Sequence, residues 1–162
     1  MVKILFVCHG NICRSAMAEF IFKDMVHKAD LDGVVTVSSA ATSTEEIGND
    51  TYPPAKAKLR EKGIPLARHS ARQITAADYN QYDYIVGMDS ENMYYMNRRW
   101  NNDPEGKVSL LMEFAGSSRE VADPWYTGNF DETYEDVVAG CKGFLYYLQQ
   151  KGDISKEIEI PR

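Results

Sequence analysis

A cysteine and an arginine stand close together near the start of the chain, in the segment Cys8-His-Gly-Asn-Ile-Cys-Arg14. The preceding run Val2–Val7 is apolar apart from Lys3 and has the length of a buried strand, and helical periodicity begins at Ser15. The segment is therefore expected to join the carboxyl end of a strand to the amino end of a helix. Unpaired backbone N–H groups and the helix dipole favour an anion at such a junction.

The residue types in this segment suit phosphate chemistry. A thiol in that field, close to a guanidinium, is expected to be a nucleophilic thiolate near neutral pH. The planar fork of donors on Arg14 can hold two oxygens of an oxyanion. The sequence thus predicts a phosphate-binding loop with Cys8 as the nucleophile and Arg14 as the clamp. The cradle between them is expected to consist of His9, Gly10, Asn11, Ile12 and Cys13.

The segment Val7–Ser15 resembles the signature loop of the low-molecular-weight protein tyrosine phosphatases, and the resemblance runs over essentially the whole chain. A bare Cys-x5-Arg pattern arises by chance, but here the Gly-Asn within it and the strand before it agree with a catalytic loop. The other matching segments are Ser38–Ser43, Ile47–Asn49, His69–Gln73, Met88-Asp89 and Asp123–Tyr126.

The resemblance implies a phosphotyrosine-protein phosphatase that hydrolyses phosphate monoesters through a cysteinyl-phosphate intermediate. Its substrates would be phosphotyrosine-containing proteins or peptides, with small aryl phosphates as substrates in vitro. No cofactor is implied.

Composition bounds the fold and the partners. The chain has 162 residues, of which 44% are hydrophobic, so one sizeable core and a single domain over residues 1–162 are expected. The net charge of −6 disfavours nonspecific binding to nucleic acid or to an anionic membrane. No apolar run approaches the length of a membrane span, and the three cysteines lack zinc spacing. We therefore expect a cytoplasmic protein without a metal.

Strand-length apolar runs alternate with helical patterns, which predicts a doubly wound parallel α/β sheet of the flavodoxin-like or Rossmann-like class, with the phosphate-binding loop after the first strand. Strands are predicted at Val2–Val7, Val34–Ala40, a short segment before Arg72, Tyr84–Met88 and Val108–Leu111. Helices are predicted at Ser15–Lys28, Tyr52–Lys62, Ala76–Tyr79, Ser90–Asn97 and Tyr134–Gln150. The tail Asp153–Arg162 is either a short edge strand or a loosely held extension.

Cleavage of a phosphate monoester also needs an acid for the leaving oxygen. Asp123 is the candidate, because Asp123-Pro124 lies in a stretch rich in Gly, Ser and Thr that predicts a loop. Taken alone, Asp-Pro is more typical of a simple turn. The resemblance favours the acid, which would be protonated for phosphorylation of Cys8 and ionised to activate water afterwards.

The resemblance also implies a substrate cleft. Trp125 and Tyr126 would wall it, so that an aryl leaving group stacks between aromatic rings, and Ile12 would lie beside them. The facing position, which is variable and often aromatic in the family, is Glu45 here, with Glu46 next to it. This acidic wall is expected to repel acidic phosphopeptides and to favour basic flanks.

Four polar residues resemble the family's supporting network, in which Asn11 adopts a left-handed conformation held by Ser15, Ser39 and His69. Asparagine tolerates a positive φ better than other non-glycine residues. His69 could instead be an exposed loop histidine. His9 departs from the commoner apolar or small residue, and it either adds positive charge near Cys8 or faces solvent.

The resemblance further implies a reversible disulfide between Cys8 and Cys13 that would protect the nucleophile from irreversible oxidation. Cys141 lies in a helical apolar run and is expected to be a buried small hydrophobe.

Three other functions are consistent with parts of the pattern. A thioredoxin-coupled arsenate reductase of the same fold needs relay cysteines, and there is no cysteine between Asp78 and Arg119. A protein-arginine phosphatase carries Thr where this chain has Ile12, and its acid loop lacks the double aromatic. A noncatalytic phosphate-binding module would lack the nucleophile or the acid.

Overall fold

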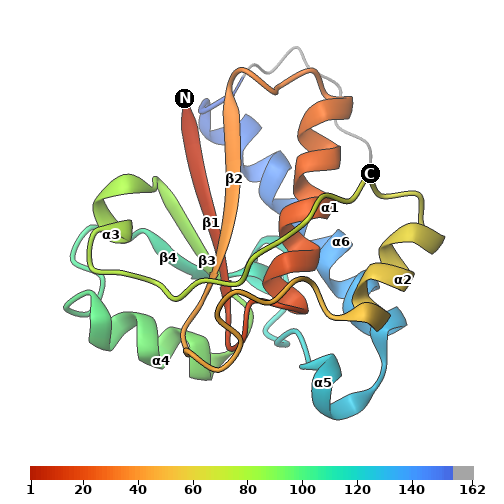
Figure 1. Cartoon of the computed structure of the whole chain (residues 1–162). Coiled ribbons are helices and arrows are strands. Elements are labelled where there is room, and N and C mark those ends of the chain that lie inside the picture. The colour runs from red at the N-terminus through yellow and green to blue at the C-terminus, as the bar shows by residue number, and fades with distance from the viewer. Residues whose placement is uncertain (155–162) are drawn as a thin grey trace.

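The sheet at the centre of the molecule is entirely parallel. The computed structural model describes residues 1–154, and its strands lie in the order β2-β1-β3-β4 (Figure 1). Their bounds are Val2–Cys8 for β1, Val35–Ala41 for β2, Tyr84–Gly87 for β3 and Val108–Leu110 for β4. The predicted parallel α/β class is confirmed, and the described residues form one domain around this sheet. Most of the tail Asp153–Arg162, predicted as either an edge strand or a loosely held extension, lies outside the described residues.

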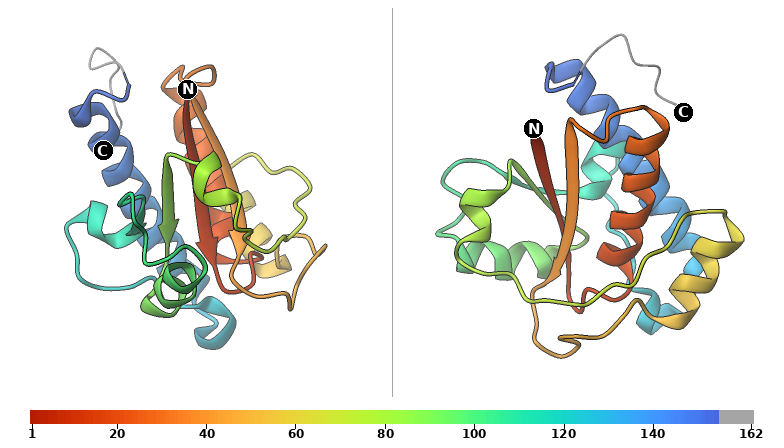
Figure 2. Two further views of the ribbon diagram at one scale, coloured as in Figure 1. Left: turned by 90° about the vertical axis from the view of Figure 1, so that its left-hand side faces the viewer. Right: turned by 45° about the horizontal axis from the view of Figure 1, so that its top comes forward.

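Helices cover both faces of the sheet. Their bounds are α1 (Arg14–Lys28), α2 (Pro53–Glu61), α3 (Asp78–Gln81), α4 (Ser90–Arg99), the 3-10 helix η1 (Leu111–Ala115), α5 (Pro124–Thr127) and α6 (Phe130–Lys151). Helices α1 and α6 lie on one face, and α3 and α4 lie on the other (Figures 1 and 2). Within residues 1–154 no helix has both the length and the apolarity needed to cross a membrane.

The alternation of side chains along β1 explains why both faces are covered. Ile4 and Phe6 pack into the core beneath α1 and α6, whereas Leu5 and Val7 pack into a second core beside α3 and α4. Successive side chains of a strand point to opposite faces, so a central strand with apolar side chains on both faces must be covered on both. The continuous apolar run at the start of the sequence therefore becomes the centre of the sheet.

Two glycines let α6 approach η1 closely. A Cβ atom at Gly143 would lie 2.0 Å from the carbonyl oxygen of Phe114, and one at Gly140 would lie 2.4 Å from a side-chain carbon of Leu111. Neither distance is compatible with a larger residue. This contact places η1, and with it the chain that leads to Asp123, against the long helix.

The predicted strand before Arg72 is wrong. Strand β2 ends at Ala41, so only one residue of it remains to pair with the segment, and a single bridge between Ala41 and Gln73 forms. The N–H of Ala41 donates to the carbonyl of Arg72 at 2.7 Å, and that of Ile74 donates to Ala41 at 2.8 Å. The segment crosses the end of the sheet and does not extend it.

Candidate active site

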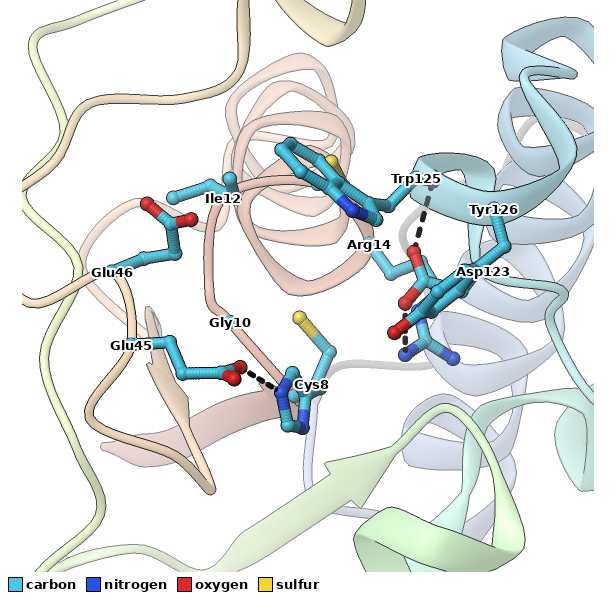
Figure 3. Close-up of a pocket in the computed structure, with 11 residues that line it drawn as sticks. Cys8, Gly10, Ile12, Arg14, Glu45, Glu46, Asp123, Trp125 and Tyr126 are labelled. Carbon is cyan, nitrogen blue, oxygen red and sulfur yellow. Dashed lines mark hydrogen bonds and ion pairs between the residues drawn. The ribbon is translucent and has the colours of Figure 1, made fainter.

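The end of β1 and the segments that follow β1 and β2 line a hollow of about 230 Å³ (Figure 3). Chain segments after neighbouring parallel strands meet at such an edge, where α/β sheets bind ligands. All the residues predicted for the nucleophile, clamp, acid and cleft line it, and so do those of the predicted cradle except Asn11, which is fully buried. The lining consists of Cys8, His9, Gly10, Ile12, Cys13, Arg14, Glu45, Glu46, Asp123, Trp125 and Tyr126.

Three donors surround the sulfur of Cys8. The backbone N–H groups of Asn11 and Ser15 point to Sγ with N···S distances of 3.3 and 3.4 Å. The Ser15 hydroxyl lies 3.0 Å from the same sulfur. This hydroxyl accepts a hydrogen bond from Asn11 Nδ2 at 2.8 Å, and its own hydrogen can point to the sulfur or to the Ala40 carbonyl, which lies 3.5 Å away. This arrangement suits an anionic sulfur as the common acceptor.

Asn11 organises the loop through an unusual backbone conformation. Its φ is 61°, as the sequence predicts, and the residue is fully buried. Its carbonyl accepts a hydrogen bond from His69 Nε2 at 2.6 Å, which establishes Nε2 as the protonated ring nitrogen. His69 is 7% exposed, so the alternative of an exposed loop histidine is wrong. The network thus holds the loop in a conformation that few other residues adopt.

Ser39 does not take the place expected for it beside Asn11. Its hydroxyl donates to Oε1 of Glu19 at 2.5 Å, because the alternation along β2 directs the Ser39 side chain towards α1. The side-chain oxygen of Asn11 accepts instead from the backbone N–H of Arg72 at 3.3 Å. The Arg72 guanidinium is in turn held by both carboxylate oxygens of Asp78, at 3.0 and 3.1 Å.

Arg14 lies at the floor of the hollow with 2% of its side chain exposed. Its Nη1 donates to Asp89 Oδ2 at 2.6 Å and to the Val121 carbonyl at 3.0 Å. Burial opposes the charge, but the neighbouring Cys8 and Asp89 outweigh it and raise the pKa of the guanidinium. The sequence did not assign Asp89 a role; the available signal was its position as the N-cap of α4 within a matching segment.

Asp123 faces the same guanidinium from the opposite side. Its Oδ2 lies 3.4 Å from Arg14 Nη2, and its Oδ1 accepts from the N–H of Trp125 at 3.1 Å. The segment predicted as a loop here contains the short helix α5, which Asp123 caps and Gly128 ends. The carboxyl group therefore lines the same hollow as the predicted cradle.

A family model described as low molecular weight phosphotyrosine protein phosphatase matches residues 3–154. The chain belongs to this family. The low molecular weight protein-tyrosine-phosphatase YfkJ of Bacillus subtilis is 36% identical over 153 residues, which are 93% of this chain and 98% of that protein. Its crystal structure superposes with a TM-score of 0.91 and covers 94% of this chain and 97% of that chain.

Two further proteins extend the range of organisms in which similar chains occur. The human low molecular weight phosphotyrosine protein phosphatase is 37% identical over 148 residues, which are 88% of this chain and 93% of that protein. The crystal structure of a Drosophila arginine phosphatase shares 30% identity and a TM-score of 0.82, and it covers 91% of this chain and 98% of that chain.

The second cysteine of this phosphatase loop differs from the first in its surroundings. Cys13 is 5% exposed, and burial together with the nearby Cys8 raises the pKa of its thiol, so that it stays protonated at neutral pH. Cys141 is completely buried in the core, where burial alone raises the pKa of its thiol. Cys8, Cys13 and Cys141 are all free thiols.

His9 lies between acidic side chains of two segments that are far apart in the sequence. Its Nε2 pairs with Oε2 of Glu45, and its Nδ1 lies 3.4 Å from Oε1 of Glu91 in α4. The imidazole therefore lines the hollow while remaining partly exposed. The sequence did not single out Glu91, because no local pattern links α4 to the loop after β1.

The walls of the hollow differ in chemistry. Figure 3 shows Glu45 and Glu46 on one side and Trp125 and Tyr126 on the other, as the sequence predicts. Trp125 is 51% exposed and Tyr126 is 82% exposed, so neither is a core residue. Within residues 1–154 no cluster of His, Cys, Asp and Glu side chains could hold a metal ion.

Proposed function

We propose that this member of a hydrolase family dephosphorylates phosphotyrosine in proteins or peptides, and small aryl phosphates in vitro, without a cofactor. The convergence of the Cys8 sulfur, the Arg14 guanidinium and the Asp123 carboxyl in one hollow carries the proposal. These three groups are the nucleophile, the oxyanion clamp and the acid that the reaction needs. Ile12, Glu45, Trp125 and Tyr126 would contact the substrate beyond its phosphate.

In the first step the Cys8 thiolate attacks phosphorus, and the bond between phosphorus and the tyrosyl oxygen breaks. Asp123 donates its proton to that oxygen, while Arg14 and the loop N–H groups hold the other oxygens of the phosphoryl group. In the second step the Asp123 carboxylate takes a proton from water, and the water oxygen attacks the cysteinyl phosphate. The sulfur–phosphorus bond breaks, and inorganic phosphate and the thiolate are released. Asp123 thus serves in both steps.

Replacing Asp123 with asparagine is expected to reduce kcat/KM, which reports the first step and not hydrolysis of the common intermediate, by about 10² to 10⁴-fold for tyrosyl and alkyl phosphates, because asparagine cannot donate the proton. The loss should be much smaller for an aryl phosphate with an activated leaving group, which needs little protonation. Steady-state rates over a series of leaving groups measure this. Equal losses across the series would show that Asp123 does not act as the acid.

A substrate panel separates the proposal from its alternatives. Phosphotyrosine peptides are expected to be hydrolysed far faster than phosphoserine or phosphoarginine peptides, and arsenate with thioredoxin should not be turned over. The phosphoarginine arm is informative because a solved arginine phosphatase shares this fold. Preferential cleavage of phosphoarginine would replace the proposed function.

We further propose that Cys13 protects the nucleophile, and that the protein works in a reducing compartment such as the cytoplasm. Peroxide would convert the Cys8 thiolate to a sulfenic acid, and the Cys13 sulfur would then form a disulfide with loss of water. The two cysteines lie in the same short loop, and both line the hollow. A thiolate nucleophile requires that this disulfide be reduced for catalysis.

Cys13→Ser is expected to retain turnover but to be inactivated irreversibly by peroxide, whereas a dithiol reductant should restore the oxidised wild type. Peptide mass mapping should find Cys8 linked to Cys13 in the oxidised wild type. Cys141→Ser is the matched control and should behave as the wild type does, because its thiol is completely buried in the core. Full recovery of oxidised Cys13→Ser would refute the protective role.

A further inference from the structure

A second hollow of about 410 Å³ adjoins the active-site hollow. The two share Ile12, Glu46 and Trp125, so the indole of Trp125 belongs to both. The second hollow is otherwise lined by a segment that leads into α2 and by the first turns of that helix. These residues are Asn49, Asp50, Thr51, Tyr52, Pro53 and Lys56.

The segment that lines this hollow is attached to the catalytic loop. The N–H of Tyr52 donates to the Ile12 carbonyl at 2.9 Å, and the Tyr52 ring lies 4.8 Å from the Trp125 ring. Asp50 accepts hydrogen bonds from Lys56 Nζ at 2.8 Å and from the N–H of His69 at 2.9 Å. The hydrogen bonds from Lys56 and His69 hold the pKa of the Asp50 carboxyl well below its usual range. These contacts fix the wall of the second hollow relative to the loop after β1.

The polar groups of the hollow are unequally satisfied. Asp50 forms an ion pair with Lys56. Glu46 instead accepts a hydrogen bond from the neutral side-chain amide of Asn49, at 2.6 Å. None of the ion pairs within residues 1–154 includes Glu46. The hydroxyl of Thr51, a residue that is 3% exposed, has no hydrogen-bond partner in the same part of the chain. An unsatisfied buried hydroxyl is costly, and a bound ligand can supply the missing partner.

This combination matches one kind of side chain. Trp125 and Tyr52 both line the hollow and offer aromatic surface to an aliphatic stem or a planar guanidinium, and tryptophan is the best aromatic partner for a cation. The unpaired carboxylate of Glu46 stands at the boundary of the two hollows, where it can meet the cationic head. An acidic side chain in the hollow would be repelled by this carboxylate, because no cation in the described part of the chain pairs with Glu46.

We infer that the second hollow is a specificity subsite that receives an arginine or lysine side chain close in sequence to the phosphotyrosine. The inference rests on the proposed function and narrows its substrates to phosphotyrosine in a basic context. Glu46 and Trp125 are its specificity-determining residues. Because Trp125 forms a wall of both hollows, the aryl ring and the neighbouring cation would contact the same indole.

The test compares kcat/KM for three peptides that differ only near the phosphotyrosine, where they carry arginine, glutamine or glutamate. Each value is divided by that of the same enzyme on phosphotyrosine amide, so that losses of catalysis cancel. The wild type is expected to prefer the arginine peptide over the glutamine peptide by about three- to fivefold, the size of an exposed charge contact. The glutamate peptide should be poorer than either.

Two variants with opposite expected effects locate the preference. Glu46→Gln should abolish the preference for arginine. Lys56→Gln removes the cation that offsets Asp50 and should increase the preference by about threefold. The hydrogen bond from His69 to Asp50 does not involve Lys56, and a thermal melt checks that the fold is kept. Lys62→Gln, the same change at the end of α2 and outside the lining, is the matched control and should keep the wild-type preference.

The outcomes separate the subsite from the function on which it rests. Turnover of phosphotyrosine amide without discrimination among the peptides would overturn the subsite alone. An unchanged preference in Glu46→Gln, or equal shifts in Lys56→Gln and Lys62→Gln, would do the same. Absence of turnover of every phosphotyrosine substrate would overturn the proposed function and the subsite with it.

Discussion

Replacing Cys8 with serine is expected to abolish turnover, with a loss of at least about 10⁴-fold in kcat, while the binding of inorganic phosphate survives. A serine hydroxyl does not ionise near neutral pH and is a poor nucleophile without an adjacent base. The cradle itself is built from backbone N–H groups and Arg14, which the substitution leaves in place. Stopped-time assays measure turnover, and calorimetric titration with inorganic phosphate measures binding separately.

The matched control for this variant is Cys141→Ser, which removes a thiol outside the loop. It should keep wild-type kcat, after allowance for any loss of stability caused by a hydroxyl in the core. Appreciable turnover by Cys8→Ser would exclude Cys8 as the nucleophile. Loss of phosphate binding in that variant would show that the sulfur shapes the cradle as well as attacking phosphorus.

Arg14→Lys is expected to lower kcat by about 10³-fold although the positive charge is kept. One ammonium group cannot reproduce the planar fork, whose Nη1 bonds Asp89 and the Val121 carbonyl while Nη2 faces Asp123 and the hollow. The loss should fall on kcat more than on KM, because the guanidinium is expected to bind the equatorial oxygens most tightly in the transition state.

The control is Arg119→Lys, which makes the same change in an arginine that holds both oxygens of Asp136, at 2.9 and 2.6 Å, outside the hollow. Its kcat should remain within about threefold of the wild type, since neither Arg119 nor Asp136 lines the hollow. A near-normal kcat in Arg14→Lys would refute the bidentate clamp and would leave a simple electrostatic role for residue 14.

The cradle between Cys8 and Arg14 could be predicted from the sequence alone, because all its parts are close together in the chain. The apolar run before Cys8, the left-handed tolerance of Asn11 and the helix that begins at Arg14 follow one another along the chain. A strand, a tight loop and a helix start leave little freedom for the backbone N–H groups between them. The alternation of strand and helix patterns likewise indicated the parallel sheet before any contact was known.

Only the tertiary structure decided what holds the charged groups. The partners of Arg14 include Asp89 and Asp123, which are 75 and 109 residues away in sequence, and they meet it because β3 lies beside β1 and α5 lies over the loop. Tertiary packing also decided that the backbone N–H of Arg72, and not Ser39, bonds the side chain of Asn11. It likewise formed the second hollow beside Trp125. Local periodicity specifies which elements form, whereas the order of strands and the packing of loops specify which side chains meet across them.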